Sequence, residues 1–185
     1  MRVHKINASN NFIAGWYIDH KICDNLIDDF EQKVRSGLSR TKEPPKNYTG
    51  VSINSINKSI LNKYLNNYLQ PCLESYLKLY HQANNCQTFK LTEGNIQRYD
   101  SEKFYDVYHF ENDGEVQRIY RHLVFMTYLN TIDSGGHTKF LYQNTSIKPE
   151  KGLTLIWPAQ WTHAHTGTYT KEIKYICTGW YNFVY

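Results

Sequence analysis

The sequence has no long apolar run, no block of basic residues and no internal repeat. No stretch approaches the roughly 18 consecutive apolar residues of a membrane-spanning helix, so we expect no membrane segment. The 21 Lys and Arg residues are spread along the chain, and the formal net charge is only +4. Because nucleic-acid sites usually concentrate basic residues on one face, this weak and dispersed charge argues against a nucleic-acid partner.

Paired cysteine motifs are also absent. Cys23, Cys72, Cys86 and Cys177 are scattered and form no CxxC. A reduced intracellular protein is the simpler interpretation, although Cys72 and Cys86 could close a loop in an oxidising compartment. The N-terminal segment MRVHKINASNNF has no apolar stretch of the kind that secretory signals carry. We therefore expect a cytoplasmic protein.

The composition fits one globular domain over residues 1–185. Hydrophobic residues make up 41% of the chain, which is typical of a protein with a buried core. Aromatic residues reach 15%, with 16 tyrosines, and aromatic side chains pack well on the half-buried surface of a sheet. The composition therefore favours a substantial content of strands.

Apolar residues recur at helical spacing in two segments of the first half. The pattern from Asp19 to Ser36 predicts a helix, with Asp19 as its N-cap and Gly37 as its C-terminal stop. The segment from about Asn57 to Gln82 has the same spacing, and Pro71 should kink it or divide it in two. The part up to about residue 87 is thus expected to be mainly helical.

From about Thr88 onward the pattern changes to short strands separated by turns, one of them expected at Glu93-Gly94. Many short strands with frequent turns are typical of an antiparallel sandwich or jelly roll. Since the helices precede the strands, we expect α+β packing in which the helices buttress one face of a sheet. The expected strands are FKLTEG, NIQRY, RHLVFMTYLN, TKFLYQ, LTLIWP and IKYICTGWYNFVY.

The segment Tyr108-His109-Phe110-Glu111 is the most informative one. On a strand, side chains two residues apart project from the same face, so His109 and Glu111 could both reach one point. An imidazole and a carboxylate supply two of the three ligands of a 2-His-1-carboxylate iron site. An HxE triplet alone also arises by chance as two solvated residues.

Two further histidines and a lysine lie near the C-terminus. His163 and His165 should share a strand face, so either could complete the triad. The turn-like segment after His165 suggests that His165 and Lys174 lie on adjacent antiparallel strands. Lys174 should face inward from a very apolar strand, on the same face as Ile176, Thr178 and Trp180. A buried lysine needs an anionic partner, and a dicarboxylate co-substrate would provide one.

The stretch from Tyr99 to Trp180 resembles the catalytic core of prolyl 4-hydroxylase-type Fe(II)/2-oxoglutarate-dependent dioxygenases, and particularly small phage-encoded members. The resemblance implies a double-stranded β-helix (jelly-roll) core over about residues 88–185, with a helical part over about 1–87. It extends loosely into the first strand and helix. The motifs that carry it, in the family's order, are RY-x8-YHFE, RHLVFMTYLN, GGHTKF, KPEKGLTLIWPA, WTHAHTG and KYICTGW.

The resemblance also implies roles for individual residues. His109 and Glu111 take the places of the first histidine and the acid, and His165, followed by Thr-Gly, takes that of the distal histidine. His163 lacks this context and is expected to line the pocket or support a ligand. Lys174 matches the basic residue that binds the distal carboxylate of 2-oxoglutarate. Other candidates are Tyr128 for the same carboxylate, Tyr99 and Thr178 as weaker co-substrate contacts, and Trp180, which could equally be core packing.

Two positions depart from the family pattern. Glu111 stands where Asp is usual, and its extra methylene moves the carboxylate outward by roughly one bond length, which the site can absorb. In the GGxT motif the usual Glu is replaced by His137, which weakens inference about the substrate. His137 could lie near the metal, although an exposed loop histidine is the simpler interpretation.

The implied activity is hydroxylation of prolyl residues in a peptide or protein, with Fe(II), 2-oxoglutarate, O2 and L-ascorbate as cofactors and release of succinate and CO2. A phage-encoded enzyme would work in the host cytoplasm. The loop at Arg40–Gly50 could be a lid over a peptide groove or an ordinary connector. Alternatives are a hydroxylase of another substrate, such as an amino acid or nucleotide, a non-catalytic jelly-roll module, and a zinc hydrolase, which would leave Lys174 unexplained. The oligomeric state is left open.

Overall fold

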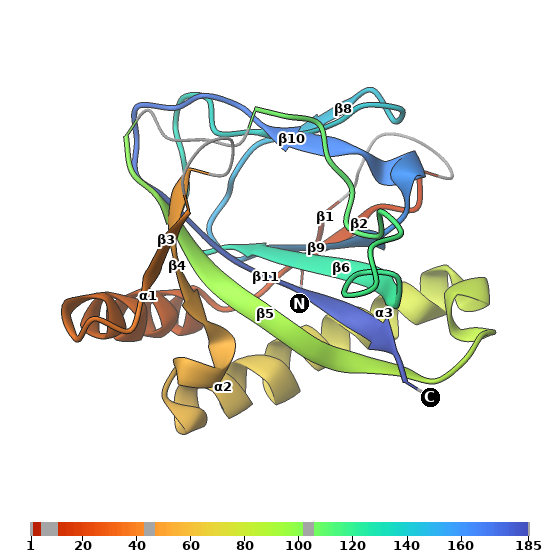
Figure 1. Ribbon diagram of the computed structural model, residues 1–185, viewed down its shortest axis with the longest axis horizontal. Coiled ribbons are helices and arrows are strands. Elements are labelled where there is room, and N and C mark those ends of the chain that lie inside the picture. The colour runs from red at the N-terminus through yellow and green to blue at the C-terminus, as the bar shows by residue number, and fades with distance from the viewer. Residues whose placement is uncertain (1, 5–10, 43–46, 102–105, 185) are drawn as a thin grey trace.

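The computed structural model describes residues 2–4, 11–42, 47–101 and 106–184 (Figure 1). Two antiparallel sheets face each other, and the helices cover the outer face of the larger one. The larger sheet runs in the order β1 (Arg2–His4), β2 (Ala14–Tyr17), β9 (Leu153–Pro158), β6 (Arg121–Tyr128), β11 (Lys174–Phe183), β5 (Phe89–Tyr99), β4 (Tyr48–Ser52), β3 (Arg40–Lys42). The smaller sheet consists of β10 (His165–Gly167), β7 (Thr138–Phe140) and β8 (Thr145–Ile147).

The helical layer follows the sequence pattern closely. Helix α1 (His20–Arg35) begins at Asp19, whose side chain accepts the backbone N–H of Lys21, and ends at Ser36. Gly37 then takes a positive φ of 74°, a conformation that glycine adopts without steric cost. The predicted bounds of this helix are therefore confirmed. Short 3-10 turns occur at Ile53–Ser55, His81–Asn84 and Trp161–His163.

The second helical segment contains the break expected near Pro71. Helices α2 (Lys58–Tyr64) and α3 (Gln70–Leu79) are joined by a π-helical turn, η2 (Leu65–Leu69), in which the N–H of Gln70 bonds to the carbonyl of Leu65. Pro71 has no N–H and its ring clashes with an ordinary α-helical carbonyl, so a widened turn just before it accommodates the ring. Among the described residues, no helix combines the length and hydrophobicity needed for a bilayer crossing.

Apolar side chains gather in two clusters, one on each face of the larger sheet. The first lies between the helices and the sheet and includes Phe30, Tyr64 and Tyr76. The second lies between the two sheets and includes Trp157 and Phe140. The predicted α+β class, with an antiparallel double-stranded β-helix core and buttressing helices, is confirmed. None of the four cysteines forms a disulfide, so the alternative closure of Cys72 on Cys86 does not occur.

Two expectations about local structure are wrong. The turn predicted at Glu93-Gly94 does not form, because Gly94 lies inside β5 opposite Gly179 of β11. A Cβ on Gly94 would come within 2.9 Å of the Thr178 carbonyl oxygen, so glycine serves here for the close approach of two strands. The segment Arg40–Gly50 is also not simply a loop: β3 pairs with β4, and β4 pairs with β5. Residues 43–46 of the expected lid lie outside the described residues.

Candidate metal and co-substrate site

A cavity of about 400 Å³ opens between the two sheets. Strands β5, β6, β9 and β11 of the larger sheet supply one side, and β7 and β10 of the smaller sheet supply the other. The segment 109–111 completes the wall. Lys174, Ile176, Thr178 and Trp180 of β11 all line the cavity, as their predicted alternation requires.

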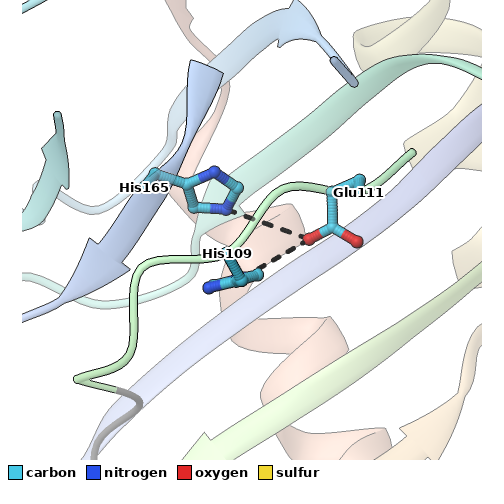
Figure 2. Close-up of side chains that lie close together, drawn as sticks. All are labelled: His109, Glu111 and His165. Atoms are coloured by element: carbon cyan, nitrogen blue, oxygen red, sulfur yellow. Dashed lines mark ion pairs between the residues drawn. The ribbon is translucent and has the colours of Figure 1, made fainter. Parts of the chain in front are cut away.

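His109, Glu111 and His165 meet at this cavity (Figure 2). One potential ligand atom from each lies within 4.8 Å of those of the other two. Glu111 Oε1 is 3.5 Å from Nε2 of His109 and 3.9 Å from Nε2 of His165. Two imidazoles and a carboxylate that converge in this way can hold a divalent metal ion.

Backbone pairing brings the two histidines together. We had expected His109 to lie on a continuous strand, and this is wrong. His109 instead forms an isolated bridge with His165. The N–H of His109 donates to the carbonyl of His165 at 3.0 Å, and the N–H of His165 donates back at 2.9 Å. Glu111 is attached separately, through its N–H to the carbonyl of Ala159 at 3.0 Å. A single bridge therefore suffices to place the HxE segment beside the distal histidine.

Hydrogen bonds at the far side of each ring orient the two imidazoles. Nδ1 of His109 contacts the Val107 carbonyl at 3.0 Å, and Nδ1 of His165 contacts the His163 carbonyl at 2.9 Å. Since a carbonyl only accepts, both Nδ1 atoms carry the proton and each Nε2 keeps a lone pair for a metal.

The protonation states suit a metal as well. Burial, and then the neighbouring His109, lower the pKa of His165 to about 4. Burial on its own would raise the pKa of Glu111, but the interactions of its carboxylate with His109, His165 and Arg121 lower it to about 2. At neutral pH the site thus offers a neutral distal imidazole and a carboxylate, which fits Fe(II) or another divalent ion with mixed N and O ligands.

His163 is not part of this group. It lies in the 3-10 turn Trp161–His163 rather than on a strand face shared with His165. Its Nε2 contacts the Asn11 carbonyl at 2.9 Å, its Nδ1 contacts the Thr162 hydroxyl, and burial lowers its pKa. Both ring nitrogens of His163 are engaged elsewhere, so His165 is the histidine positioned to join His109.

Lys174 lies across the cavity from the histidines, and the expected strand arrangement around it is wrong. His165 belongs to the smaller sheet and Lys174 to the larger, so the two residues face each other between sheets rather than sit on adjacent strands. Lys174 is 5% exposed, its Nζ donates to the Gly136 carbonyl at 3.1 Å, and it lies 5.1 Å from the centre of the Tyr99 ring.

Burial lowers the pKa of Lys174 to about 8. Within the described part of the chain, no carboxylate pairs with its ammonium. A buried ammonium without a counter-ion is costly, and an anionic ligand in the cavity would offset that cost.

The other candidates for the co-substrate pocket differ in their access to the cavity. Tyr99 and Thr178 line it, but the Tyr99 hydroxyl donates to Gln97 at 2.7 Å and the Thr178 hydroxyl to the Phe125 carbonyl at 2.8 Å. Tyr128 is fully buried behind the wall. Its hydroxyl donates to Oγ1 of Thr138 at 2.6 Å, and Thr138 does face the cavity.

His137 is not in the histidine cluster and is not among the residues that line the cavity. Its backbone N–H donates to the Thr168 hydroxyl, and burial and the nearby lysines lower the pKa of its side chain. His137 is thus part of the loop before β7, as the simpler interpretation expected, but it is half-buried rather than exposed.

Sequence reasoning missed Arg121. This residue is 8% exposed, lines the cavity, and donates to Oε2 of Glu111 at 3.0 Å. The available signal was an arginine at the head of the apolar strand RHLVFMTYLN, a position where a charge more often marks the surface. Its partners come from distant parts of the sequence, so no local pattern reveals them.

Comparisons with known proteins agree with this geometry. Residues 94–182 match the model of the 2OG-Fe(II) oxygenase superfamily. No curated protein sequence is similar to this chain at a significant level. The resemblance to 2-oxoglutarate oxygenases stated from the sequence motifs is thus confirmed.

Solved structures share the fold at low sequence identity. The viral collagen prolyl hydroxylase of Paramecium Bursaria Chlorella virus-1, in complex with 2-oxoglutarate, has a TM-score of 0.71 at 18% identity, with 95% of this chain and 98% of that chain covered. A Pseudomonas putida prolyl-4-hydroxylase gives 0.74 at 14% identity, covering 95% of each chain. A Trichoplax adhaerens prolyl hydroxylase in complex with a hypoxia inducible factor peptide fragment gives 0.69 at 16%, covering 94% of this chain and 84% of that one.

Proposed function

We propose that this chain, whose residues 94–182 match the 2OG-Fe(II) oxygenase superfamily, is a dioxygenase of the prolyl hydroxylase type that converts 2-oxoglutarate to succinate and CO2. The observation that carries the proposal is the composition of one cavity. It joins a His–Glu–His cluster to a buried lysine that has no carboxylate partner among the described residues, so it can hold a metal ion and an anion side by side.

Each group has a role that follows from its surroundings. His109, Glu111 and His165 would hold Fe(II), and the iron would supply the activation of O2 that hydroxylation of a C–H bond requires. Lys174 would bind the distal carboxylate of 2-oxoglutarate with its ammonium. Tyr128 acts on the same end of the cavity through the hydroxyl of Thr138, which it orients.

The cavity walls complete the site. Met126, Trp157 and Ile176 are buried apolar residues that face the cavity, so they keep water away from the reacting groups and strengthen the electrostatic interactions between them. Tyr99 and Thr178 are held by their own hydrogen bonds, which makes them fixed walls rather than mobile contacts.

A prolyl residue of a peptide or protein is the substrate we propose, with L-ascorbate as reductant of the iron. The support is that the similar solved structures are prolyl hydroxylases, one of them holding a peptide fragment. A viral protein is among them, which is compatible with a phage-encoded enzyme acting in the host cytoplasm.

The test begins with binding. Anaerobic Fe(II) and 2-oxoglutarate should give a weak visible charge-transfer band with the wild-type protein and none with His109→Ala. Succinate formation with a panel of proline-containing peptides then tests turnover. If the wild-type protein gives neither the band nor succinate, the oxygenase assignment is wrong; a band without turnover on any peptide would instead favour a non-catalytic module or a different substrate.

A further inference from the structure

We propose that Arg121 is a positioning residue that makes Glu111 present a single oxygen to the metal site. This inference rests on the proposed function. Glu111 Oε1 faces the two imidazoles, while Oε2 accepts a hydrogen bond from Nη1 of Arg121 at 3.0 Å. The two oxygens of one carboxylate thus have separate partners.

The guanidinium of Arg121 is fixed from several sides. Its Nε and Nη2 donate to Oε1 of Glu93, at 3.1 and 2.7 Å. Its Cζ lies 3.7 Å from the centre of the Trp180 ring, a cation–π distance. Nη1 also reaches the backbone carbonyl of Glu111 at 3.3 Å. Because the planar fork is held by Glu93 and Trp180, it can hold Glu111 in one orientation.

The orientation of Glu111 matters because a carboxylate can bind a metal through one oxygen or through both. A 2-His-1-carboxylate site has room for both a chelating keto acid and O2 only if the acid gives one oxygen, because a second carboxylate oxygen would occupy one of the positions that they need. Glutamate also has one more rotatable bond than aspartate, so its carboxylate is easier to turn. The charge-assisted bond from Arg121 to Oε2 opposes such a turn and keeps positions free for a keto acid and O2.

The test uses Co(II) in place of Fe(II), so that binding is read from the visible spectrum without turnover. Arg121→Gln removes the charge-assisted bond. Arg98→Gln is the matched control: Arg98 also pairs with a glutamate, Glu31 at 2.9 Å, but it is not among the residues that line the cavity. Two quantities are measured on each protein: the spectrum of the Co(II)-loaded protein, and the Kd of 2-oxoglutarate at saturating Co(II).

We expect Arg121→Gln to change the Co(II) spectrum and to weaken 2-oxoglutarate binding by about 10-fold to 100-fold, the usual effect of losing a group that orients a ligand. Arg98→Gln should match the wild type in both. Arg121→Lys keeps a buried cation, which protects folding, but it loses the planar fork. Its Kd for 2-oxoglutarate should therefore lie between that of the wild type and that of Arg121→Gln.

Two failures can be told apart. If wild-type protein takes up no Co(II), the proposed function fails and this inference fails with it. If wild-type protein binds Co(II) and 2-oxoglutarate, and the two Arg121 variants have its spectrum and a Kd within twofold of its own, only the role of Arg121 is refuted.

Discussion

Replacing Lys174 by Met should stabilise the free protein and weaken its binding of 2-oxoglutarate. Burial lowers the pKa of Lys174 from its ordinary value of 10.5 to about 8. At about 1.4 kcal/mol per pKa unit, the folded protein at pH 7 carries on the order of 3 kcal/mol of cost for this ammonium. Methionine has a similar length and no charge, so the variant escapes this cost.

Part of the gain is offset, because the Gly136 carbonyl loses the hydrogen bond that it accepts from Lys174. A lost hydrogen bond of this kind costs about 1 kcal/mol. We therefore expect a net increase of about 2 kcal/mol in the free energy of unfolding. The loss of a charge-assisted bond to the distal carboxylate is worth up to about 3 kcal/mol, which is roughly a 100-fold increase in the Kd of 2-oxoglutarate.

The assay is urea unfolding at pH 7, with and without 2-oxoglutarate, in the presence of Mn(II) so that no turnover occurs. Lys139→Met is the control, because Lys139 is an exposed residue of β7, the strand that carries Thr138. Two results would refute the reasoning: a Lys174→Met protein less stable than wild type by 1 kcal/mol or more, or one that 2-oxoglutarate still stabilises as it does wild type.

Four more predictions concern the same molecule. The Kd of 2-oxoglutarate should rise about tenfold per pH unit above pH 8 in the wild type, because the Lys174 ammonium is present below its pKa and lost above it, and this dependence should be absent in Lys174→Met. The stability advantage of Lys174→Met over the ligand-free wild type should shrink between pH 8 and 10.5, where the folded wild type has released the Lys174 proton that its unfolded state still holds; denaturant midpoints of both proteins across this range check the sign. In Tyr128→Phe, Thr138 loses the donor that orients it, so isothermal titration should show 2-oxoglutarate binding about fivefold weaker, and an unchanged Kd would mean that the tyrosine has no part in the pocket. Gly179→Ala should lower stability by about 1–3 kcal/mol in thermal or urea unfolding, since its Cβ would come within 2.4 Å of the Glu93 carbonyl oxygen; a neutral effect would show that β5 and β11 can separate freely.

Local patterns predicted the parts of the fold that depend on local interactions. The bounds of α1 follow from apolar spacing together with the Asp19 cap and Gly37, all within one segment. The segment Arg40–Gly50 looked like a loop because it is polar and rich in proline and lysine. Its strands exist because β4 hydrogen-bonds to β5, whose paired residues lie 43 to 49 positions further along the chain, and no local pattern contains that partner.

Some residues of the candidate site could likewise be predicted from local patterns, and others depend on the assembled fold. His109 and Glu111 could be paired from their spacing, and the ordered motifs indicated His165 and Lys174. Strand spacing alone left His163 and His165 as alternatives, and the 3-10 turn directs His163 toward Asn11 and away from the cluster. Arg121 could not be found, because its role depends on Glu93 and Glu111, which reach it only after the strands have assembled.

The reciprocal backbone bridge between His109 and His165 has a consequence for the way the protein gains and loses its metal. Main-chain hydrogen bonds set the spacing of the two imidazoles, so the segments that carry His109 and His165 are joined before any ion arrives. Loading then needs no ordering of a loop, and a chelator should strip the ion at a rate set by ligand dissociation rather than by unfolding. The amide hydrogens of both residues should accordingly exchange slowly with solvent in the metal-free protein, as they do in a continuous sheet.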